Sequence, residues 1–178
     1  MASNTENSIR ISWNKVNNAD GYEVFRSLSE NGLYVKVKTI EDKTITTTSS
    51  PNLQAATTYY YKVRAYKLVN GNKQYGEFSI VQTSTKPKAV NNLKSLNVTN
   101  NSIKIGWDEV SGVSGYEVFR SINENGSYVK VGTTSNLDYT SKSVVSGKTY
   151  YYKVKAYRLI GATKTYGSYS NVLKVTVK

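Results

Sequence analysis

Apolar and polar residues alternate with a period of two along short stretches of the chain. Ile9, Ile11 and Trp13 alternate with Arg10 and Ser12. Successive side chains of a strand point to opposite faces, so this pattern predicts a strand with one buried face. The same alternation predicts strands over residues 22–26 and 59–66, and richness in β-branched Thr predicts an edge strand over 44–49. Turn signals place two further strands over residues 34–40 and 73–83. No segment has helical periodicity, and the pattern therefore indicates an all-β protein.

Turn-forming residues separate these stretches. Asn70-Gly71 is a strong hairpin signal because both residues tolerate positive φ. Glu30-Asn31-Gly32 predicts a tight turn, and the run from Asn17 to Gly21 predicts another. About seven short strands at this spacing are typical of a β-sandwich.

The pattern occurs twice in the chain. The heptapeptide Gly21–Ser27 returns unchanged at 115–121, and Thr58–Val63 returns unchanged at 149–154. The repeated unit is far longer than a solenoid repeat, so each copy is expected to be a domain. We expect domains over residues 1–86 and 87–178, joined by a short linker that contains Pro87.

Both copies also share an order of aromatic and aliphatic residues. A tryptophan lies on an early strand, and Gly-Tyr-x-Val begins the next strand. An aliphatic residue, a turn and an alternating Tyr-x-Tyr-x-Val-x-Ala strand come later. The residues at these positions are Trp13, Leu53, Tyr59 and Ala65 in one copy and Trp107, Val144, Tyr150 and Ala156 in the other. This order resembles the fibronectin type III domain, especially the bacterial kind found in exported multidomain proteins. The resemblance implies two tandem seven-stranded immunoglobulin-like sandwiches. It also implies that Tyr59 and Tyr150 form a tyrosine corner, with the phenol bonded to nearby backbone.

The two copies differ at their first strand. The second copy has a leading strand from Val90 to Asn97, with Leu93 and Leu96 as expected core residues. In the first copy the Leu96 position aligns with Ala2, so its first strand is expected to be truncated. The loop before the last strand lacks Arg-Gly-Asp in both copies, which gives no support for integrin binding.

The composition argues against catalysis. The chain has neither Cys nor His, which removes thiolate chemistry, disulfides, the commonest general base and the commonest metal ligand. Glu23 and Glu117 recur in both copies, as do Glu30 and Glu124, which suggests scaffold or solubility roles. The adjacent pairs Glu41-Asp42 and Asp108-Glu109 each occur in one copy only. We expect no enzyme activity, no catalytic residues, no metal site and no cofactor.

Positively charged residues and tyrosines make up the candidate site. The net charge is +12, with +4 up to Pro87 (11 Lys+Arg, 7 Asp+Glu) and +8 beyond it (13 and 5), which implies weak attraction to polyanions. The outward positions of the Tyr-rich strand form a candidate ligand face, joined by Phe25 and Phe119. Its members are Tyr60, Lys62, Arg64, Tyr66, Tyr151, Lys153, Lys155 and Tyr157. The alternative is an ordinary solvent-covered sheet face. Nucleic acid is not expected, because no recognised motif is present.

The resemblance implies a non-catalytic accessory or spacer module of a bacterial secreted or cell-surface protein. Its partners would be the neighbouring domains of a larger exported parent, and the module itself is expected to be a monomer. One alternative is a carbohydrate- or cell-wall-binding adhesion module, with polysaccharide or an anionic wall polymer as the partner. Another is a protein-interaction module that pairs through a strand edge. No apolar run is long enough for membrane insertion.

Overall fold

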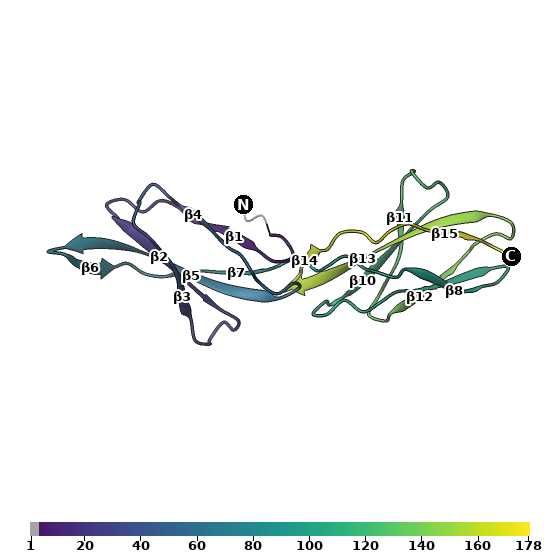
Figure 1. The fold of residues 1–178 in the computed structure, drawn as a ribbon, viewed down its shortest axis with the longest axis horizontal. Coiled ribbons are helices and arrows are strands. Elements are labelled where there is room, and N and C mark those ends of the chain that lie inside the picture. Colours follow the sequence, from purple (N-terminus) through teal and green to yellow (C-terminus); the bar gives the residue numbers. More distant parts are fainter. Residues whose placement is uncertain (1–3) are drawn as a thin grey trace. The chain divides into compact units, whose positions relative to one another are not determined.

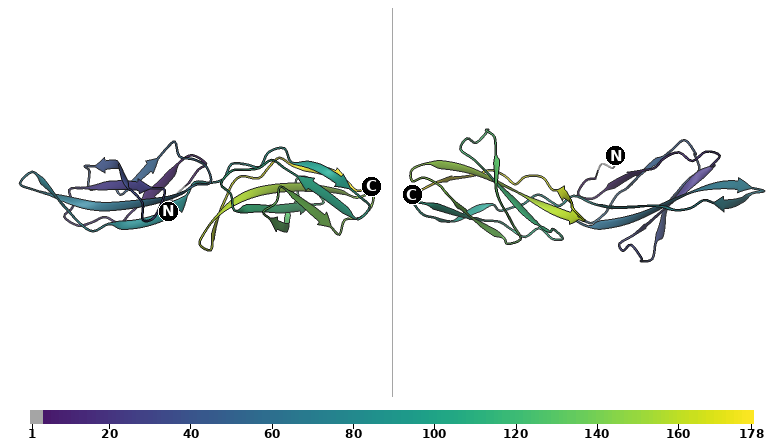
Figure 2. Two further views of the ribbon diagram at one scale, coloured as in Figure 1. Left: turned by 90° about the horizontal axis from the view of Figure 1, so that it is seen from below. Right: turned by 180° about the vertical axis from the view of Figure 1, so that it is seen from behind.

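The computed structural model describes residues 4–178, and every regular element in that range is a β-strand (Figure 1). The chain divides into two compact units, Met1–Thr85 and Lys86–Lys178. Among the described residues there is no helix that could cross a membrane. Each unit places its strands in two layers, as the views in Figure 2 show.

Within residues 4–85, the first unit contains seven strands in two antiparallel sheets. The smaller sheet pairs β1 with β4, and the larger has the order β3-β2-β5-β6, with β7 also paired to β5. The strands are β1 (Ile9–Ser12), β2 (Gly21–Ser27), β3 (Val35–Ile40), β4 (Thr47–Ser50), β5 (Thr58–Val69), β6 (Asn72–Tyr75) and β7 (Ser79–Ser84).

The second unit repeats this arrangement and has one strand more than the described part of the first unit. Its smaller sheet has the order β12-β9-β8, and its larger sheet has the order β11-β10-β13-β14, with β15 paired to β13. The strands are β8 (Lys94–Val98), β9 (Ser102–Gly106), β10 (Gly115–Ser121), β11 (Val129–Thr134), β12 (Asp138–Lys142), β13 (Thr149–Ile160), β14 (Thr163–Tyr166) and β15 (Leu173–Thr176).

The apolar positions of the alternating strands meet between the two sheets. In the first unit Ile9 and Ile11 pack with Tyr22, Val24 and Tyr61 in one buried cluster. The second unit buries the repeated residues in the same way, and its Trp107 lies inside the cluster, whereas Trp13 is only partly buried against the first. The predicted alternation of Ile9, Ile11 and their copies is therefore confirmed.

The tyrosine corners are also confirmed. The hydroxyl oxygen of Tyr59 accepts a hydrogen bond from the Gln54 amide at 3.0 Å. The hydroxyl oxygen of Tyr150 accepts one from the Val145 amide at 3.2 Å. Each bond ties the chain before the long strand to the strand itself, which fixes the crossover between the two sheets.

The predicted last strand of the first copy, residues 73–83, is interrupted by a bulge. Tyr66 pairs with Tyr75 and Val63 pairs with Ser79, so three residues on one strand face two on the other. The second unit has six residues facing four at this place. A bulge of this kind bends the strand and redirects the side chains within it.

The expectation that Leu96 is a core residue is wrong. Leu93 is 5% exposed, but Leu96 is 49% exposed. The register of β8 shifts between Ser95 and Asn97, which leaves Leu96 unpaired in a bulge. Its side chain lies against Gly106 instead, within 2.6 Å of where a Cβ of that residue would be. The aligned residue of the first copy, Ala2, lies outside the described residues.

Candidate functional site

The candidate face is the outer surface of the larger sheet in each unit. Because β5 alternates, Tyr60, Lys62 and Arg64 lie on the side opposite the core residues Tyr61 and Val63. The register between β2 and β5 places Glu23 directly beside Arg64, and Phe25 beside Lys62. The sheet therefore brings a carboxylate, two cations and an aromatic ring together.

Glu23 lies at the centre of this face and is only 1% exposed. One oxygen, Oε2, accepts hydrogen bonds from Arg64 Nη2 at 2.8 Å and Nε at 3.2 Å. The other, Oε1, is 3.2 Å from Lys36 Nζ and 3.3 Å from Lys73 Nζ. The Tyr75 hydroxyl also donates to Oε1 at 3.4 Å. Three cations from β3, β5 and β6 thus converge on one carboxylate of β2.

This environment stabilises the ionised form of Glu23. Burial on its own raises the pKa of the carboxyl group, but the hydrogen bonds from Arg64, Lys36 and Lys73 outweigh it and lower the pKa to about 2. The contact with Glu23 in turn raises the pKa of Lys73 against the opposing effect of desolvation. Glu23 is therefore ionised throughout the neutral range.

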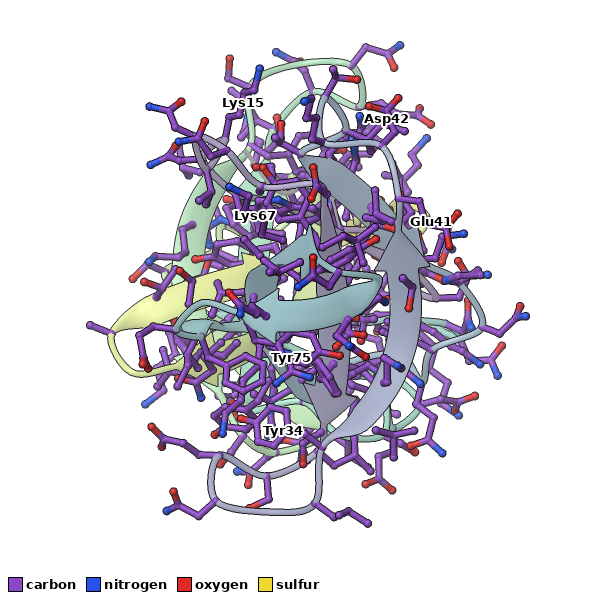
Figure 3. All side chains as sticks on the ribbon, turned by 90° about the vertical axis from the view of Figure 1, so that its left-hand side faces the viewer. Lys15, Tyr34, Glu41, Asp42, Lys67 and Tyr75 are labelled. Carbon is purple, nitrogen blue, oxygen red and sulfur yellow. The ribbon has the colours of Figure 1, made fainter. Side chains whose placement is uncertain are left out.

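Aromatic rings surround the cations of the first unit. The Arg64 guanidinium carbon is 3.5 Å from the Tyr75 ring centroid and 5.1 Å from that of Phe78. Lys62 Nζ lies 4.0 Å from the ring centroid of Tyr34. Figure 3 shows Tyr34 and Tyr75 on the same side of the unit, away from Lys15 and Asp42. Contacts between cations and ring faces at these distances are attractive and hold both partners in place.

The second unit repeats the buried carboxylate with a different set of cations. Glu117 Oε1 is 2.8 Å from Lys164 Nζ and 3.5 Å from Lys130 Nζ, and it accepts a hydrogen bond from the Tyr166 hydroxyl at 3.1 Å. Burial raises the pKa of Glu117, but these hydrogen bonds and charges outweigh it, so its pKa is lowered. Lys155 replaces Arg64, and its Nζ lies 4.1 Å from the Tyr166 ring centroid and makes no ion pair with Glu117 within 4.0 Å.

The bulges in the last strands add rings to this face. Phe78, inside the bulge of the first unit, contacts Phe25 edge to face with ring centroids 5.5 Å apart. In the second unit Tyr169 contacts Phe119 in the same way at 5.2 Å. The expectation that Phe25 and Phe119 join the face is confirmed by these contacts and by their cation–π distances to Arg64 and Lys155.

The sequence placed Tyr66 on this face as an exposed ring, and that expectation needs correction. Tyr66 is buried, because its hydroxyl lies over Gly21, where a Cβ would not fit, and Lys73 Nζ covers its ring at 4.1 Å. Its copy Tyr157 is half-buried, and Lys164 Nζ lies 4.1 Å from its ring centroid. The two tyrosines therefore support the hairpin rather than offer a surface.

The remaining candidates, Tyr60, Lys62, Arg64, Tyr151, Lys153 and Lys155, are all half-buried. The Gln82 amide donates a hydrogen bond to the Tyr60 hydroxyl at 3.0 Å, and Lys153 Nζ lies 4.2 Å from the Tyr128 ring centroid. Sequence reasoning assigned Glu23 and Glu117 to scaffold or solubility roles, without locating them at the centre of the face. The sequence did carry a signal for this placement. Each glutamate lies between two core residues of its strand, and the strand expected beside it is rich in cationic residues.

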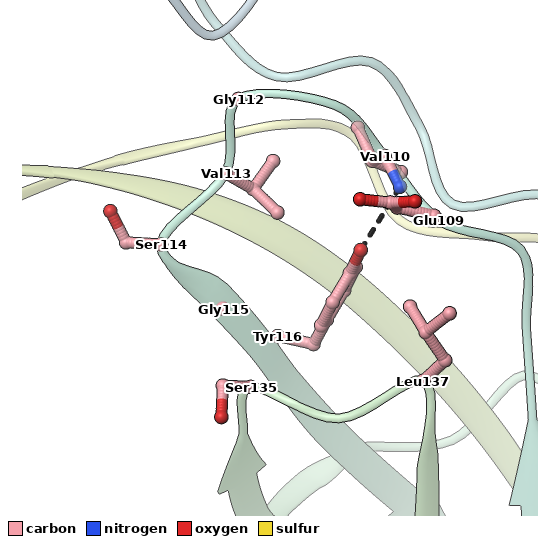
Figure 4. A pocket seen from close by; sticks show the side chains of 9 residues that line it. All are labelled: Glu109, Val110, Gly112, Val113, Ser114, Gly115, Tyr116, Ser135 and Leu137. Atoms are coloured by element: carbon pink, nitrogen blue, oxygen red, sulfur yellow. Dashed lines mark hydrogen bonds between the residues drawn. The ribbon is translucent and has the colours of Figure 1, made fainter.

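A small pocket in the second unit offers no catalytic arrangement. It encloses about 300 Å³ between the segment before β10 and the segment before β12 (Figure 4). The hydroxyl of Tyr116 accepts a hydrogen bond from the Val110 amide at 3.0 Å, as Figure 4 shows. Glu109 is the single ionisable carboxylate among its lining residues, so the pocket lacks the second carboxylate of a glycosidase.

The acidic residues elsewhere do not form a metal centre. Asp42 Oδ1 accepts hydrogen bonds from the Thr44 hydroxyl and amide at 2.6 and 2.8 Å, and these lower its pKa. Asp20 Oδ2 accepts one from the Leu68 amide at 2.8 Å. Within residues 4–178, no group of three acidic side chains is placed to hold a metal ion.

Comparisons with known proteins agree with this architecture. No family model matches the chain. Exoglucanase B of Cellulomonas fimi is 28% identical over 174 residues, which is 87% of this chain and 14% of that enzyme. Amylopullulanase of Thermoanaerobacter thermohydrosulfuricus is 33% identical over 82 residues, which is 43% of this chain and 5% of that enzyme. The chain thus spans a small fraction of both relatives.

A solved structure gives the fold. A segment of two fibronectin type III domains from chicken tenascin matches with a TM-score of 0.59 and 18% identity, and the match covers 99% of this chain and 97% of that one. The two units with their repeated order of strands are consistent with this match. The chain therefore has the fold of tandem fibronectin type III domains, and it resembles parts of bacterial multidomain proteins.

Proposed function

We propose that the chain is a non-catalytic accessory module of a larger bacterial secreted or cell-surface protein, in which it holds neighbouring domains apart and orients them. The observation that carries this proposal is the internal pairing of the candidate face. In each unit a buried glutamate binds two or three of the cations that would otherwise be available to a ligand. Cations held in this way stabilise the sheet surface and are less free to bind partners.

The comparisons with known proteins also support a role as an accessory module. Both curated relatives are named as enzymes of polysaccharides, and each is far longer than this chain. A two-unit chain that matches only a small part of such an enzyme is more consistent with an accessory region than with the catalytic domain. Export of the parent protein is inferred from the same relatives.

A carbohydrate-binding role is the second candidate, and three exposed rings favour it. Tyr75 and Phe78 in the first unit and Tyr169 in the second are exposed at the edge of the face. Exposed rings next to cations can stack on sugar rings or attract anionic polymers. The spacing role is preferred because these rings already contact the cations beside them.

Retention on polysaccharides separates the two functions. The chain is passed over cellulose, starch, pullulan, chitin and peptidoglycan at moderate salt, and a spacer is expected to show no retention on any of them. Retention that disappears in Tyr75→Ala and Phe78→Ala, but persists in the matched variant Tyr60→Ala, would overturn the spacing proposal and support the binding one. Circular dichroism of each variant checks that the fold is intact.

A distance measurement tests the spacing role directly. Because the chain has no Cys, Glu6→Cys and Lys178→Cys allow a fluorescent donor and acceptor to be attached at two unique sites. A stiff spacer gives one narrow distribution of single-molecule energy transfer, since the short linker with Pro87 limits bending. Pro87→Gly is expected to broaden that distribution. An equally broad distribution in the unmodified linker would contradict the proposal.

A further inference from the structure

The outer face of the larger sheet in the second unit carries three lysines that no carboxylate pairs with. Lys153 and Lys155 lie two residues apart on β13, and Lys174 of β15 lies directly beside Tyr151 on the same face. None of the ion pairs within residues 4–178 includes any of the three lysines. Unpaired ammonium groups that lie close together attract an anion.

Aromatic rings hold two of these lysines in place. Lys155 Nζ lies 4.8 Å from the ring centroid of Tyr169 and 5.1 Å from that of Phe119. Lys153 Nζ lies 4.2 Å from the ring centroid of Tyr128 and 5.9 Å from that of Tyr169. A ring face attracts an ammonium group but carries no net charge, so the N–H donors of the lysine still have their full charge for an anion. A side chain that is already held loses less conformational entropy when a ligand binds.

The matching positions of the first unit are different. Arg64 stands at the position of Lys155, and its Nη2 pairs with Glu23 at 2.8 Å. Gln82 stands at the place of Lys174 beside the long strand, where it donates a hydrogen bond to a tyrosine hydroxyl. The first unit therefore neutralises one of the three matching positions with a carboxylate and has no cation at another. The unpaired positive charge is concentrated on the second unit.

The position of Tyr169 among these lysines selects the chemistry of a ligand. Its ring is 44% exposed, and two ammonium groups lie within 6 Å of the ring centroid. A group that stacks on this ring must therefore carry its negative charge itself, as a sugar with a carboxylate on its ring does. In a nucleotide the phosphate is separated from the base by a sugar. Both β10 and β13 are hydrogen-bonded on both sides, so the face has no free backbone groups for an extended peptide.

We propose that the outer face of the second unit, around Tyr169, binds an acidic polysaccharide whose sugar rings carry carboxylates. One sugar ring stacks on Tyr169, and its carboxylate accepts hydrogen bonds from Lys153 and Lys155, whose Cα atoms lie about 7 Å apart at the spacing of a strand. The carboxylate of a neighbouring sugar pairs with Lys174. This site is additional to the spacing role and does not depend on it.

The test uses the full chain and a linear oligosaccharide of galacturonic acid. The ¹⁵N-resolved NMR titration is done at about 0.1 M salt, which screens exposed charges more than about 10 Å apart. We expect saturable shifts at Phe119, Lys153, Lys155, Tyr169, Lys174 and their neighbours, and no saturable shifts in the first unit. The fully methyl-esterified oligosaccharide has the same rings without the charge, and it is expected not to saturate the site.

Variants of the chain check the position of the oligosaccharide. Lys153→Gln and Lys155→Gln are each expected to lower the affinity about fivefold, because each removes one ion pair with the ligand. Tyr169→Ala is expected to lower it about tenfold, whereas Tyr169→Phe keeps the ring and is expected to stay within about twofold. Lys142→Gln removes the same charge from β12 of the smaller sheet, and this matched control is expected to leave the affinity unchanged. The amide spectrum of each variant shows whether the fold is intact.

Several results would overturn the proposal. The absence of saturable shifts at millimolar oligosaccharide, or equal binding of the methyl ester, would show that the lysines do not form an anion site. An equal loss of affinity in Lys142→Gln and Lys153→Gln would assign the binding to diffuse charge. A tetraglutamate peptide or a short single-stranded DNA that binds as tightly, with no loss in Tyr169→Ala, would make that class of molecule the occupant. None of these results changes the distance distribution expected of a spacer, so the two proposals fail separately.

Discussion

Among single residues, Glu23 and Glu117 have the largest consequence for the candidate face. A carboxylate that loses water on burial is stabilised only by opposite charges and hydrogen-bond donors close to it. The antiparallel register supplies these partners, because it sets Arg64 beside Glu23 on the neighbouring strand. Lys36 reaches the same carboxylate from β3, and Lys73 reaches it from β6, on the far side of β5. The glutamate is therefore a structural element of the sheet.

Replacing Glu23 with Gln is expected to lower the free energy of unfolding of the first unit by about 2 kcal/mol at pH 7, because three cations lose their common partner. Its pKa of about 2 in the folded chain lies below the ordinary value of 4.5. The stabilisation is therefore complete above pH 4.5 and is lost as the pH falls towards 2. Urea unfolding at pH 7 and pH 3 measures both effects.

Each unit contains one tryptophan, so ¹⁹F NMR of the fluorotryptophan-labelled chain assigns the loss of stability to a unit. Glu30→Gln, at an exposed position, is the matched control and is expected to change the free energy by less than about 0.5 kcal/mol. A Glu23→Gln chain that keeps the full decline in stability between pH 4.5 and 2 would show that other carboxylates cause the decline.

The tyrosine corners give a second prediction for single residues. Tyr59→Phe and Tyr150→Phe each remove the oxygen that accepts from a backbone amide. We expect each variant to lose about 1 to 2 kcal/mol of stability in its own unit, because that amide is left without its partner. Tyr60→Phe, whose hydroxyl binds only the Gln82 side chain on the surface, is expected to lose less. Equal losses at Tyr59 and Tyr60 would contradict a special role for the corner.

For whole strands, alternation together with turn signals and β-branched content predicted where most of them lie. In β1, and in β5 from Thr58 to Val63, burial follows a period of two, and the core enforces it, since a shift of one residue would expose every apolar side chain. Bulges interrupt this period of two. The extra residues after β6 and β14 and the irregular residue in β8 depend on local backbone geometry, and their sequences carry no periodic signal.

The residues of the candidate face were likewise predictable only where the period of two holds. Period two correctly assigned Tyr60, Lys62 and Arg64 to the outer side of the sheet. It could not show that Tyr66 is covered, because the cover comes from Lys73 on the next strand and from the space above Gly21. Nor could it place Phe78 and Tyr169, which reach the face only through the bulges.

The bulge in β8 gives a prediction for that strand. Leu93→Ala is expected to cost about 2 to 4 kcal/mol, because a buried side chain is replaced by a cavity. Leu96→Ala is expected to cost less than about 1 kcal/mol, because Leu96 is half-exposed. Thermal or urea unfolding of the two variants gives the comparison. If both leucines prove equally costly, Leu96 belongs to the core in solution, and the bulge assigned to β8 is incorrect.

For the whole molecule, the two copies keep the same buried carboxylate while their surface charge diverges. The part up to Pro87 carries +4 and the remainder +8. This charge lies outside the buried clusters and is spread over the surface, so its effect on a polyanion acts over a distance comparable to the Debye length. That length is about 10 Å at 0.1 M salt. Attraction of this kind does not depend on the position of particular rings.

Weak, salt-sensitive retention on a polyanion is therefore expected. On an anionic polymer column the chain should be retained at about 20 mM salt and released by about 0.2 M, because screening removes attraction between exposed charges. Tyr75→Ala and Phe78→Ala should elute with the unmodified chain, whereas Lys142→Glu with Lys148→Glu, both at exposed positions of the second unit, should elute earlier. If the ring variants elute first instead, the rings bind the polymer specifically. Diffuse charge would then not account for the interaction, and the candidate face would be a binding site for anionic polymers.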